Sequence, residues 1–370
     1  MASPIIARQR SATIDAEWAK LVRAPSRLVV IFTRQLSSML RNAVPISQAL
    51  DTLSHQPENQ GFGEIIRQIG GRLETGVPFS RCLSYFPRVF SPIFVTMVQI
   101  GEQTGTLDDC MERLSLWLER DDALNQRLRS ALAYPGFVFV LSVGMTLALF
   151  YSVMPGFISI FRDMKMELPM VTKLVVWFTD ALRNPGTVFM GLALIGFAVK
   201  AFRSWTATPA GMCQFYRFCL RVPILGGMLR FGSLSRYCAG MEALLTTGLD
   251  LAKALRMAAT ASGSPVINED APFVVESVIQ GEQLSAYMRS RPEIYPMTLT
   301  NFVASGEETS TLPDMYGRTA VFYDMEMSYK VEALGASLEP IMLFGVSTMV
   351  GTIVLSIFLP LYSYIGNLGQ

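Results

Sequence analysis

The amino-acid sequence predicts an all-α membrane protein with two duplicated cytoplasmic helical-bundle domains and three transmembrane helices. Only 16% of the 370 residues are charged and 51% are hydrophobic, whereas average soluble proteins contain roughly 25% charged residues. Two long stretches contain no charge, and the first third of the chain is repeated in the last third. The formal net charge of +1 is not that of a protein that neutralises many phosphates, so we expect no nucleic-acid partner.

Two expected membrane spans are uncharged segments that lie between prolines. They are residues 136–154, bounded by Pro135 and Pro155, and residues 341–359, bounded by Pro340 and Pro360. At about 1.5 Å per residue, a helix of either length covers most of a hydrocarbon core of about 30 Å. Each segment therefore predicts a transmembrane helix.

The internal repeat has a constant offset of 205 residues. This offset aligns Gly101-Glu102 with Gly306-Glu307, Pro87 with Pro292, and the prolines that bound the first span with those that bound the last. The repeating unit is therefore a globular domain followed by a membrane helix. If both domains lie on one side of the membrane, the first and last spans cross it in the same direction, and an odd number of crossings must separate them. Residues 185–202, apolar as far as Lys200, are the predicted third span.

Each globular domain is expected to be a helical bundle. Apolar residues recur at spacings of three and four, and no alternating strand pattern with tight turns is present. Residues 42–45 and 247–250 are expected to form short turns, with Asp250 where the first copy has Pro45. Gly76 and Gly281 are expected to end helices, and Ser80 and Ser285 are candidate N-caps of the helices that follow.

The expected orientation places the N-terminus in the cytoplasm. Residues 1–10 contain Arg8 and Arg10 and no apolar run, unlike a secretory signal peptide. Positive residues near the spans favour the same orientation, because they are more frequent on cytoplasmic flanks. The cytoplasmic set would be Arg120, Arg127, Arg129, Lys200, Arg203, Arg217 and Lys330, and the periplasmic set Arg162, Lys165, Lys173 and Arg183.

The resulting domain organisation follows the chain in order. The expected boundaries are 1–27 for an N-terminal segment, 28–135 for the first cytoplasmic helical domain, 136–154 for the first transmembrane helix, 155–184 for a periplasmic loop, 185–202 for the second transmembrane helix, 203–340 for the second cytoplasmic helical domain, 341–359 for the third transmembrane helix and 360–370 for a periplasmic tail.

Residues suited to catalysis or metal binding are scarce. The five cysteines are scattered without a CxxC pair, so we expect reduced, mostly packed thiols. The single histidine, His55, is expected in an exposed polar loop. No GxxxxGK[ST], GxSxG or HExxH motif occurs, and Asp108-Asp109 and Asp121-Asp122 are interpreted as surface charge. We therefore expect no enzyme activity, no catalytic residue, no cofactor and no metal.

The most distinctive motif is the string Gly101-Glu102-Gln103-Thr104-Gly105-Thr106-Leu107. The second copy reads Gly306-Glu307-Glu308-Thr309-Ser310-Thr311-Leu312. This motif, the duplication and the order of the spans together resemble the type II secretion protein F and type IV pilus PilC family. The resemblance covers residues 28–370, and the segment before it, residues 1–27, is short for the family, which favours a pilus-type member.

The resemblance implies a multi-pass platform protein of the bacterial inner membrane. Such a scaffold couples a cytoplasmic ATPase to the assembly of pilin or pseudopilin subunits, contacts other inner-membrane assembly proteins and lipid, and is expected to form a homo-oligomer. Some relatives are thought to bind calcium, but no ligand set can be carried over to this chain. The alternative hypothesis is a small integral-membrane transporter or channel subunit, although the first and last spans contain no ionisable residue.

Two hypotheses remain open for the motif itself. The first is structural: the string forms a glycine-permitted turn that starts a helix, with Thr106-x-x-Asp109 at capping-box spacing. The second is functional: the string presents Glu102 and Glu307 to a partner protein or a divalent cation. The candidate partner-contact or turn residues are Gly101, Glu102, Thr104, Gly105, Leu107, Gly306, Glu307, Thr309 and Leu312.

Overall fold

The structure, a computed structural model, describes residues 24–55, 60–163, 169–222 and 225–368. Within these ranges all regular secondary structure is α-helical, which confirms the predicted all-α fold class. Most of the expected N-terminal segment, including Arg8 and Arg10, lies outside the described residues. The chain divides into two compact units, which we call the repeat unit (residues 1–126 and 226–327) and the apolar unit (residues 127–225 and 328–370).

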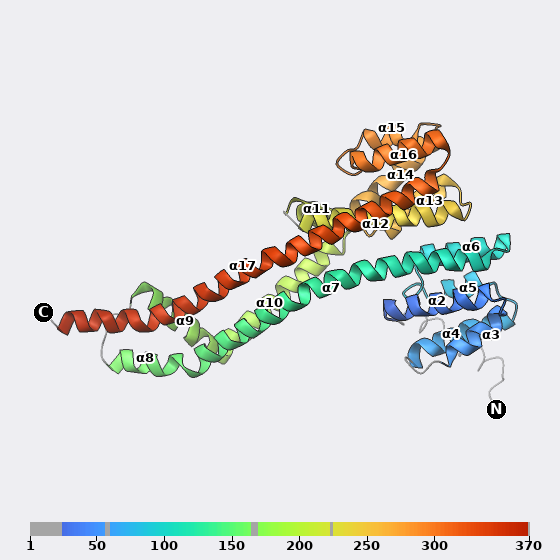
Figure 1. Ribbon diagram of the computed structural model, residues 1–370. Coiled ribbons are helices and arrows are strands. Elements are labelled where there is room, and N and C mark those ends of the chain that lie inside the picture. Colours follow the sequence, from blue (N-terminus) through green and yellow to red (C-terminus); the bar gives the residue numbers. More distant parts are fainter. Residues whose placement is uncertain (1–23, 56–59, 164–168, 223–224, 369–370) are drawn as a thin grey trace, which may run out of the picture. The chain divides into compact units, whose positions relative to one another are not determined.

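The repeat unit contains both copies of the duplicated domain (Figure 1). The first copy is built from α2 (Ser26–Arg41), α3 (Ile46–Ser54), α4 (Gln60–Glu74), α5 (Phe79–Ser84), α6 (Pro92–Thr104) and the beginning of α7 (Leu107–Ser152). The second is built from α12 (Leu225–Thr246), α13 (Leu251–Ala261), α14 (Pro265–Ile279), α15 (Leu284–Arg289), α16 (Met297–Thr309) and the beginning of α17 (Leu312–Leu368). From α3 to α7, each helix begins 205 residues before its counterpart.

The turns that end the helices follow the sequence signals. The backbone takes positive φ at Gly76 (85°) and Gly281 (86°), each the second residue after α4 or α14 ends. This left-handed conformation is one that glycine adopts without strain. Asp250, at the position of Pro45, accepts a hydrogen bond from the Lys253 backbone amide at 3.4 Å and so caps α13. Both predicted helix ends are confirmed, and Asp250 replaces proline with an equally good helix start.

Helix α12 is the centre of the repeat unit. Thirteen of its residues are buried, and they cover its whole circumference rather than one face. On one side Ser235 donates a hydrogen bond to Asp324 of α17. On another, Glu242 lies 3.2 Å from the Arg120 guanidinium of α7. A helix that is apolar or small all round is stable only inside a core, and the repeats therefore share one hydrophobic core.

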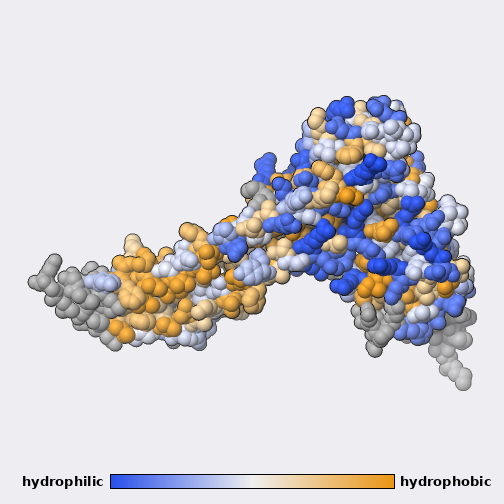
Figure 2. Space-filling view, in the orientation of Figure 1, coloured by the Kyte–Doolittle hydropathy of each residue, from blue (hydrophilic) through white to orange (hydrophobic). Residues whose placement is uncertain are grey.

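The apolar unit contains the membrane-spanning candidates. Its helices are the later parts of α7 and α17 together with α8 (Met154–Asp163), α9 (Met170–Arg183), α10 (Pro185–Thr206) and α11 (Pro209–Arg221). Three helices in the described chain are long and apolar enough to cross a membrane: α7 continued into α8, α10 and α17. The three predicted spans are thus present, and Figure 2 shows apolar side chains gathered over this unit. Pro135 and Pro340 lie inside helices rather than at helix ends.

Helix α9 lies within the segment that was expected to be a periplasmic loop, and its amphipathicity is inverted. Thr172 and Thr179 are buried, and the Thr172 hydroxyl donates to the Ser356 carbonyl oxygen of α17 at 3.0 Å. On the other side, Met170, Leu174 and Trp177 are 85%, 65% and 70% exposed. An outward apolar face at i, i+4 and i+7 is typical of a helix in contact with lipid.

The two copies of the duplicated domain have different cores. In the second copy the carboxylate of Asp270 is buried and accepts hydrogen bonds from the Tyr287 and Tyr295 hydroxyls at 3.0 and 2.9 Å. It also lies 2.9 Å from the Arg291 guanidinium. Burial and the nearby Asp270 carboxylate raise the pKa of Tyr287 to about 12, so its hydroxyl remains a donor. The offset carries Asp270 onto Ile65, which is buried among apolar side chains.

We expect the substitution Asp270→Ala to lower the free energy of unfolding by about 3–5 kcal/mol, because it leaves a buried set of donors without their shared acceptor. Tyr295→Phe should cost less in the Asp270→Ala background than in the unmodified protein, since its hydroxyl has already lost its acceptor. Denaturant unfolding of the detergent-solubilised protein measures both. Additive effects of the two substitutions would show that this network does not act as a unit.

Candidate functional site

The duplicated Gly-Glu motif forms the turn between α6 and α7 and the matching turn between α16 and α17. Gly101 and Gly306 are buried where these helices approach each other. A Cβ atom added to Gly101 would lie 2.9 Å from Leu107 Cα, and one added to Gly306 would lie 3.1 Å from Leu312 Cα. A side chain at Gly101 would force the Leu107 backbone to shift, and one at Gly306 would require its neighbours to move by a few tenths of an ångström. Glycine therefore suits the close approach to the motif leucine in both copies.

The fifth residue of the motif has a left-handed backbone in both copies. Gly105 has φ 74°, and Ser310 takes φ 55° at the same position. A non-glycine residue pays a steric cost in this region. Serine in place of glycine at position 310 therefore raises the conformational free energy of the turn, while the backbone keeps the same left-handed conformation.

The motif threonines hold the same turn. The Thr104 hydroxyl donates to the Ile100 carbonyl oxygen at 2.8 Å, and its oxygen is 2.7 Å from that of Thr106. Thr309 repeats both contacts, at 2.7 and 2.6 Å. Leu107 and Leu312 then begin α7 and α17.

Glu102 reaches back across the domain to the N-terminus of α5. Its Oε1 accepts a hydrogen bond from the Phe79 backbone amide, and its Oε2 accepts from the Ser80 amide at 3.0 Å and from the Ser80 hydroxyl. The first amides of a helix have no partner inside the helix, so a carboxylate placed there satisfies them and is favoured by the helix dipole.

Glu307 makes the same contacts in the second copy. Its two carboxylate oxygens accept from the Leu284 and Ser285 backbone amides at 2.7 and 3.0 Å. The prediction that Ser80 and Ser285 are N-caps was wrong, because both lie inside their helices, after Phe79 and Leu284. The distant glutamates supply the carboxylate that a local cap would have supplied, and no local spacing reveals such a contact.

A shallow groove of about 510 Å³ lies beside Glu102. It is lined by Pro78, Ser80, Arg81, Ser84, Val95, Gln99, Glu102 and Gln103. Burial raises the pKa of the nearby Cys82 thiol, and the charge of Glu102 raises it further, so this thiol remains protonated. The carboxylate already accepts three hydrogen bonds, and within the described residues no cluster of three His, Cys, Asp or Glu side chains could hold a metal ion. The geometry is that of a brace between α6 and α5.

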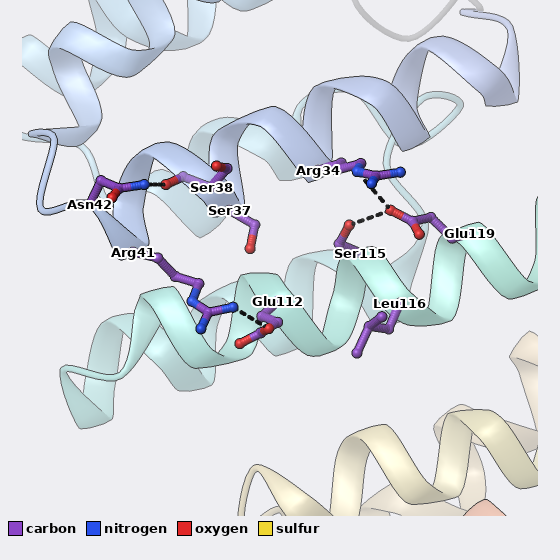
Figure 3. Close-up of a pocket in the computed structure, with 9 residues that line it drawn as sticks. All are labelled: Arg34, Ser37, Ser38, Arg41, Asn42, Glu112, Ser115, Leu116 and Glu119. Atoms are coloured by element: carbon purple, nitrogen blue, oxygen red, sulfur yellow. Dashed lines mark hydrogen bonds and ion pairs between the residues drawn. The ribbon is translucent and has the colours of Figure 1, made fainter.

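A second groove, of about 590 Å³, lies between α2 and α7 and was not predicted (Figure 3). Arg41 contacts Glu112 across it, and Arg34 Nε lies 3.7 Å from Glu119 Oε1. Charged residues spaced along two helices are indistinguishable in the sequence from ordinary solvated faces. This groove differs from its equivalent in the second copy, which α7 covers.

The cysteines and the histidine lie where the sequence indicated. None of the five thiols forms a disulfide, and Cys82, Cys110, Cys213 and Cys238 are buried. His55 follows the last turn of α3, and its side chain is 68% exposed. Asp121, interpreted as surface charge, instead lies 3.3 Å from Arg236 of α12. It therefore belongs to the contact between the repeats.

We expect Glu307→Gln to lower the free energy of unfolding by about 1–3 kcal/mol, because the amide keeps one acceptor oxygen and leaves one helix-terminal N–H unsatisfied. Glu308→Gln is the matched control, since Glu308 is the exposed neighbour and the first copy already has Gln103 there. Denaturant unfolding compares the two variants. Equal stability, together with loss of secretion or piliation in Glu102→Gln at normal abundance, would instead favour the partner-contact hypothesis for the motif.

The comparisons with known proteins agree with the duplicated architecture. The family model described as type II secretion system protein F matches twice, over residues 32–155 and 237–360. The chain is 34% identical to a type IV pilus assembly protein PilC of Thermus thermophilus, over 92% of this chain and 83% of that protein. It is 27% identical to a type II secretion system protein F of Pseudomonas aeruginosa, over 91% and 83%. With both copies of the domain matched, this chain belongs to the type II secretion system protein F family.

Proposed function

We propose that this chain is an inner-membrane platform protein of a type IV pilus or type II secretion machine, which couples a cytoplasmic ATPase to the assembly of pilin or pseudopilin subunits. The observation that carries the proposal is the continuity of α7 and α17. Each begins at a Gly-Glu turn in the repeat unit and continues, as one helix, into an apolar membrane-spanning candidate. Each turn is therefore joined to a membrane-spanning candidate by one helix, within which Pro135, Pro340 and Pro360 each remove a backbone hydrogen bond.

The lengths of these helices suit such a role. At about 1.5 Å per residue, the 46 residues of α7 extend roughly 69 Å. The turn at the start of α7 is braced by Glu102 against α5, and the turn at the start of α17 is braced by Glu307 against α15. The helices are thus anchored firmly at one end, as mechanical coupling requires.

Catalytic and transport roles have less support. In the described residues the motif glutamates are engaged by helix-terminal amides, which leaves them poorly placed as general bases. The spans over 136–154 and 341–359 contain no ionisable residue of the kind that marks an ion or proton path. The relatives are named for pilus assembly and secretion. We therefore favour a scaffold over a transporter or channel subunit.

The proposal includes an N-terminus in the cytoplasm and both repeats on the cytoplasmic side. The segment 155–184 and the tail 360–370 would then be periplasmic. Within that segment, we place the exposed apolar face of α9, which includes Leu174 and Trp177, against lipid acyl chains at the periplasmic leaflet. Lys173, in the first turn of α9, would extend toward the headgroups.

Labelling with a membrane-impermeant thiol reagent tests the orientation. In a Cys219→Ser background, which removes the one thiol that is not buried, Asp163→Cys should react in intact cells. His55→Cys and Gln280→Cys, both at exposed positions, should react only after the membrane is permeabilised, because they lie in the two cytoplasmic repeats. Reaction of His55→Cys or Gln280→Cys in intact cells would refute this topology.

Co-purification tests the assignment as a platform. A tagged chain solubilised from its host membrane should enrich a secretion-type ATPase and a pilin-like subunit relative to an untagged control, since a scaffold acts through these contacts. The purified chain itself should hydrolyse no ATP above the control preparation. Enrichment of neither protein, together with solute flux in reconstituted vesicles, would favour the transporter alternative.

A further inference from the structure

The two copies of the duplicated domain differ in whether their main groove is covered. In the second copy, α7 of the first copy lies over the groove between α12 and α17. Arg120 of α7 lies 3.2 Å from Glu242 of α12 and 3.8 Å from Asp324 of α17, so it reaches both walls. In the first copy, the equivalent groove between α2 and α7 is the open one drawn in Figure 3.

The repeat offset matches the walls of the two grooves residue by residue. Ala239 and Ala243 on α12 are only 5% and 6% exposed. Their counterparts on α2 are Arg34 and Ser38, both exposed, with the Arg34 side chain 74% exposed. The same backbone surface is therefore covered in one copy and uncovered in the other.

The helix face that would cover the open groove is also present and also exposed. In the first copy this face belongs to α7, where Trp117 is 9% exposed against the second copy. Arg120 corresponds to Met325 on α17, and Leu116 corresponds to Val321. Met325 and Val321 are 50% and 44% exposed, and Arg318 lies on the same side of the helix. Among the described residues, the groove of the first copy is thus open, and the α17 face equivalent to the covering face of α7 is exposed.

The charges of this groove and face are matched. Arg120 meets two acids, Glu242 and Asp324. At the corresponding positions the open groove has Ser37 and Glu119, and Glu119 is held by Arg34 within the groove wall. The residue that would cover the open groove is the uncharged Met325. The open groove therefore has one acid, which Arg34 contacts, and the face that would cover it has no arginine at this position.

We propose that the open groove between α2 and α7 binds the α17 face around Val321 and Met325 of a second copy of this chain. The contact repeats, between chains, the packing that joins the two copies within one chain. Because the groove and the face are different surfaces, the contact is heterologous: it closes into a ring or extends as a filament. The proposal gives a surface to the self-association in the proposed function, and it does not depend on coupling to an ATPase.

Disulfide trapping between differently tagged chains tests the contact. One chain carries Ser38→Cys and the other Met325→Cys, both in the Cys219→Ser background. Ser38 corresponds to Ala243 and Met325 corresponds to Arg120, and Ala243 and Arg120 line the same cavity within one chain. Mild oxidation should give a mixed dimer, sensitive to reductant, only when both chains are present. Thr260→Cys, at an exposed position on α13, replaces Met325→Cys as the control and should give none.

Each alternative occupant gives a different result. A dimer of Ser38→Cys with itself would indicate a two-fold contact, and a crosslink to another protein would identify a different partner. A mixed dimer that appears only after residues 2–23 are deleted would indicate that the N-terminal segment fills the groove. Any of these results, or an oligomer that gives no mixed dimer, overturns the proposal while leaving the co-purification test of the platform role unaffected.

A disruptive substitution supplies a second measurement. Met325→Asp places an acid opposite Glu119, and it should shift the detergent-solubilised protein from its oligomeric mass toward the monomer mass. Because Met325 is half exposed, the unfolding midpoint should stay that of the unmodified protein. Thr260→Asp should leave the mass unchanged. An oligomer that keeps its mass in Met325→Asp, with folding intact, would contradict the proposed surface.

Discussion

The burial of α12 on all sides is the constraint on which the repeat unit depends. Such a helix must bring its neighbours close, and small residues allow this. A Cβ atom added to Gly240 would lie 3.5 Å from the Ala258 side chain and 3.7 Å from Ile93 of the first copy. A Cβ atom added to Gly232 would lie closer still, 2.8 Å from the Met327 sulfur of α17. Because α12 contacts both α7 and α17, the two helices that continue into membrane-spanning candidates begin in one shared core rather than in two separate domains.

Duplication has kept the backbone of the two copies and changed their chemistry. Helices α3 to α6 begin at equivalent residues in both copies, yet the first core places Ile65 where the second buries Asp270 with its tyrosine and arginine partners. A buried carboxylate is tolerated only when its hydrogen bonds are satisfied. The second copy satisfies them at equivalent backbone positions, which shows that the fold depends on volume and burial more than on one core composition.

The glutamate of the repeated motif joins elements that are distant in sequence. In each copy it leaves the turn before a long helix and binds the N-terminus of a helix 22 or 23 residues earlier. Because α5 and α15 have only six residues each, they gain little from their own hydrogen bonds and need an external acceptor. The motif thereby ties the base of α7 and α17 to the body of its own repeat.

The sequence by itself determined the elements whose signals are local. These are the apolar spans, the glycine-ended helices and the duplication. An uncharged stretch such as 136–154 needs an apolar environment of the kind that lipid supplies. Gly76 or Gly281 adopts positive φ at little cost wherever it lies. Tertiary structure alone decided which groups meet across the chain: Glu102 with Ser80, Arg120 with Glu242 and Asp324, and Thr172 with Ser356. Those contacts depend on the packing of helices that are distant in the sequence. Local spacing predicted a serine cap at Ser80, whereas the carboxylate of Glu102 is the group that accepts from the helix-terminal amides.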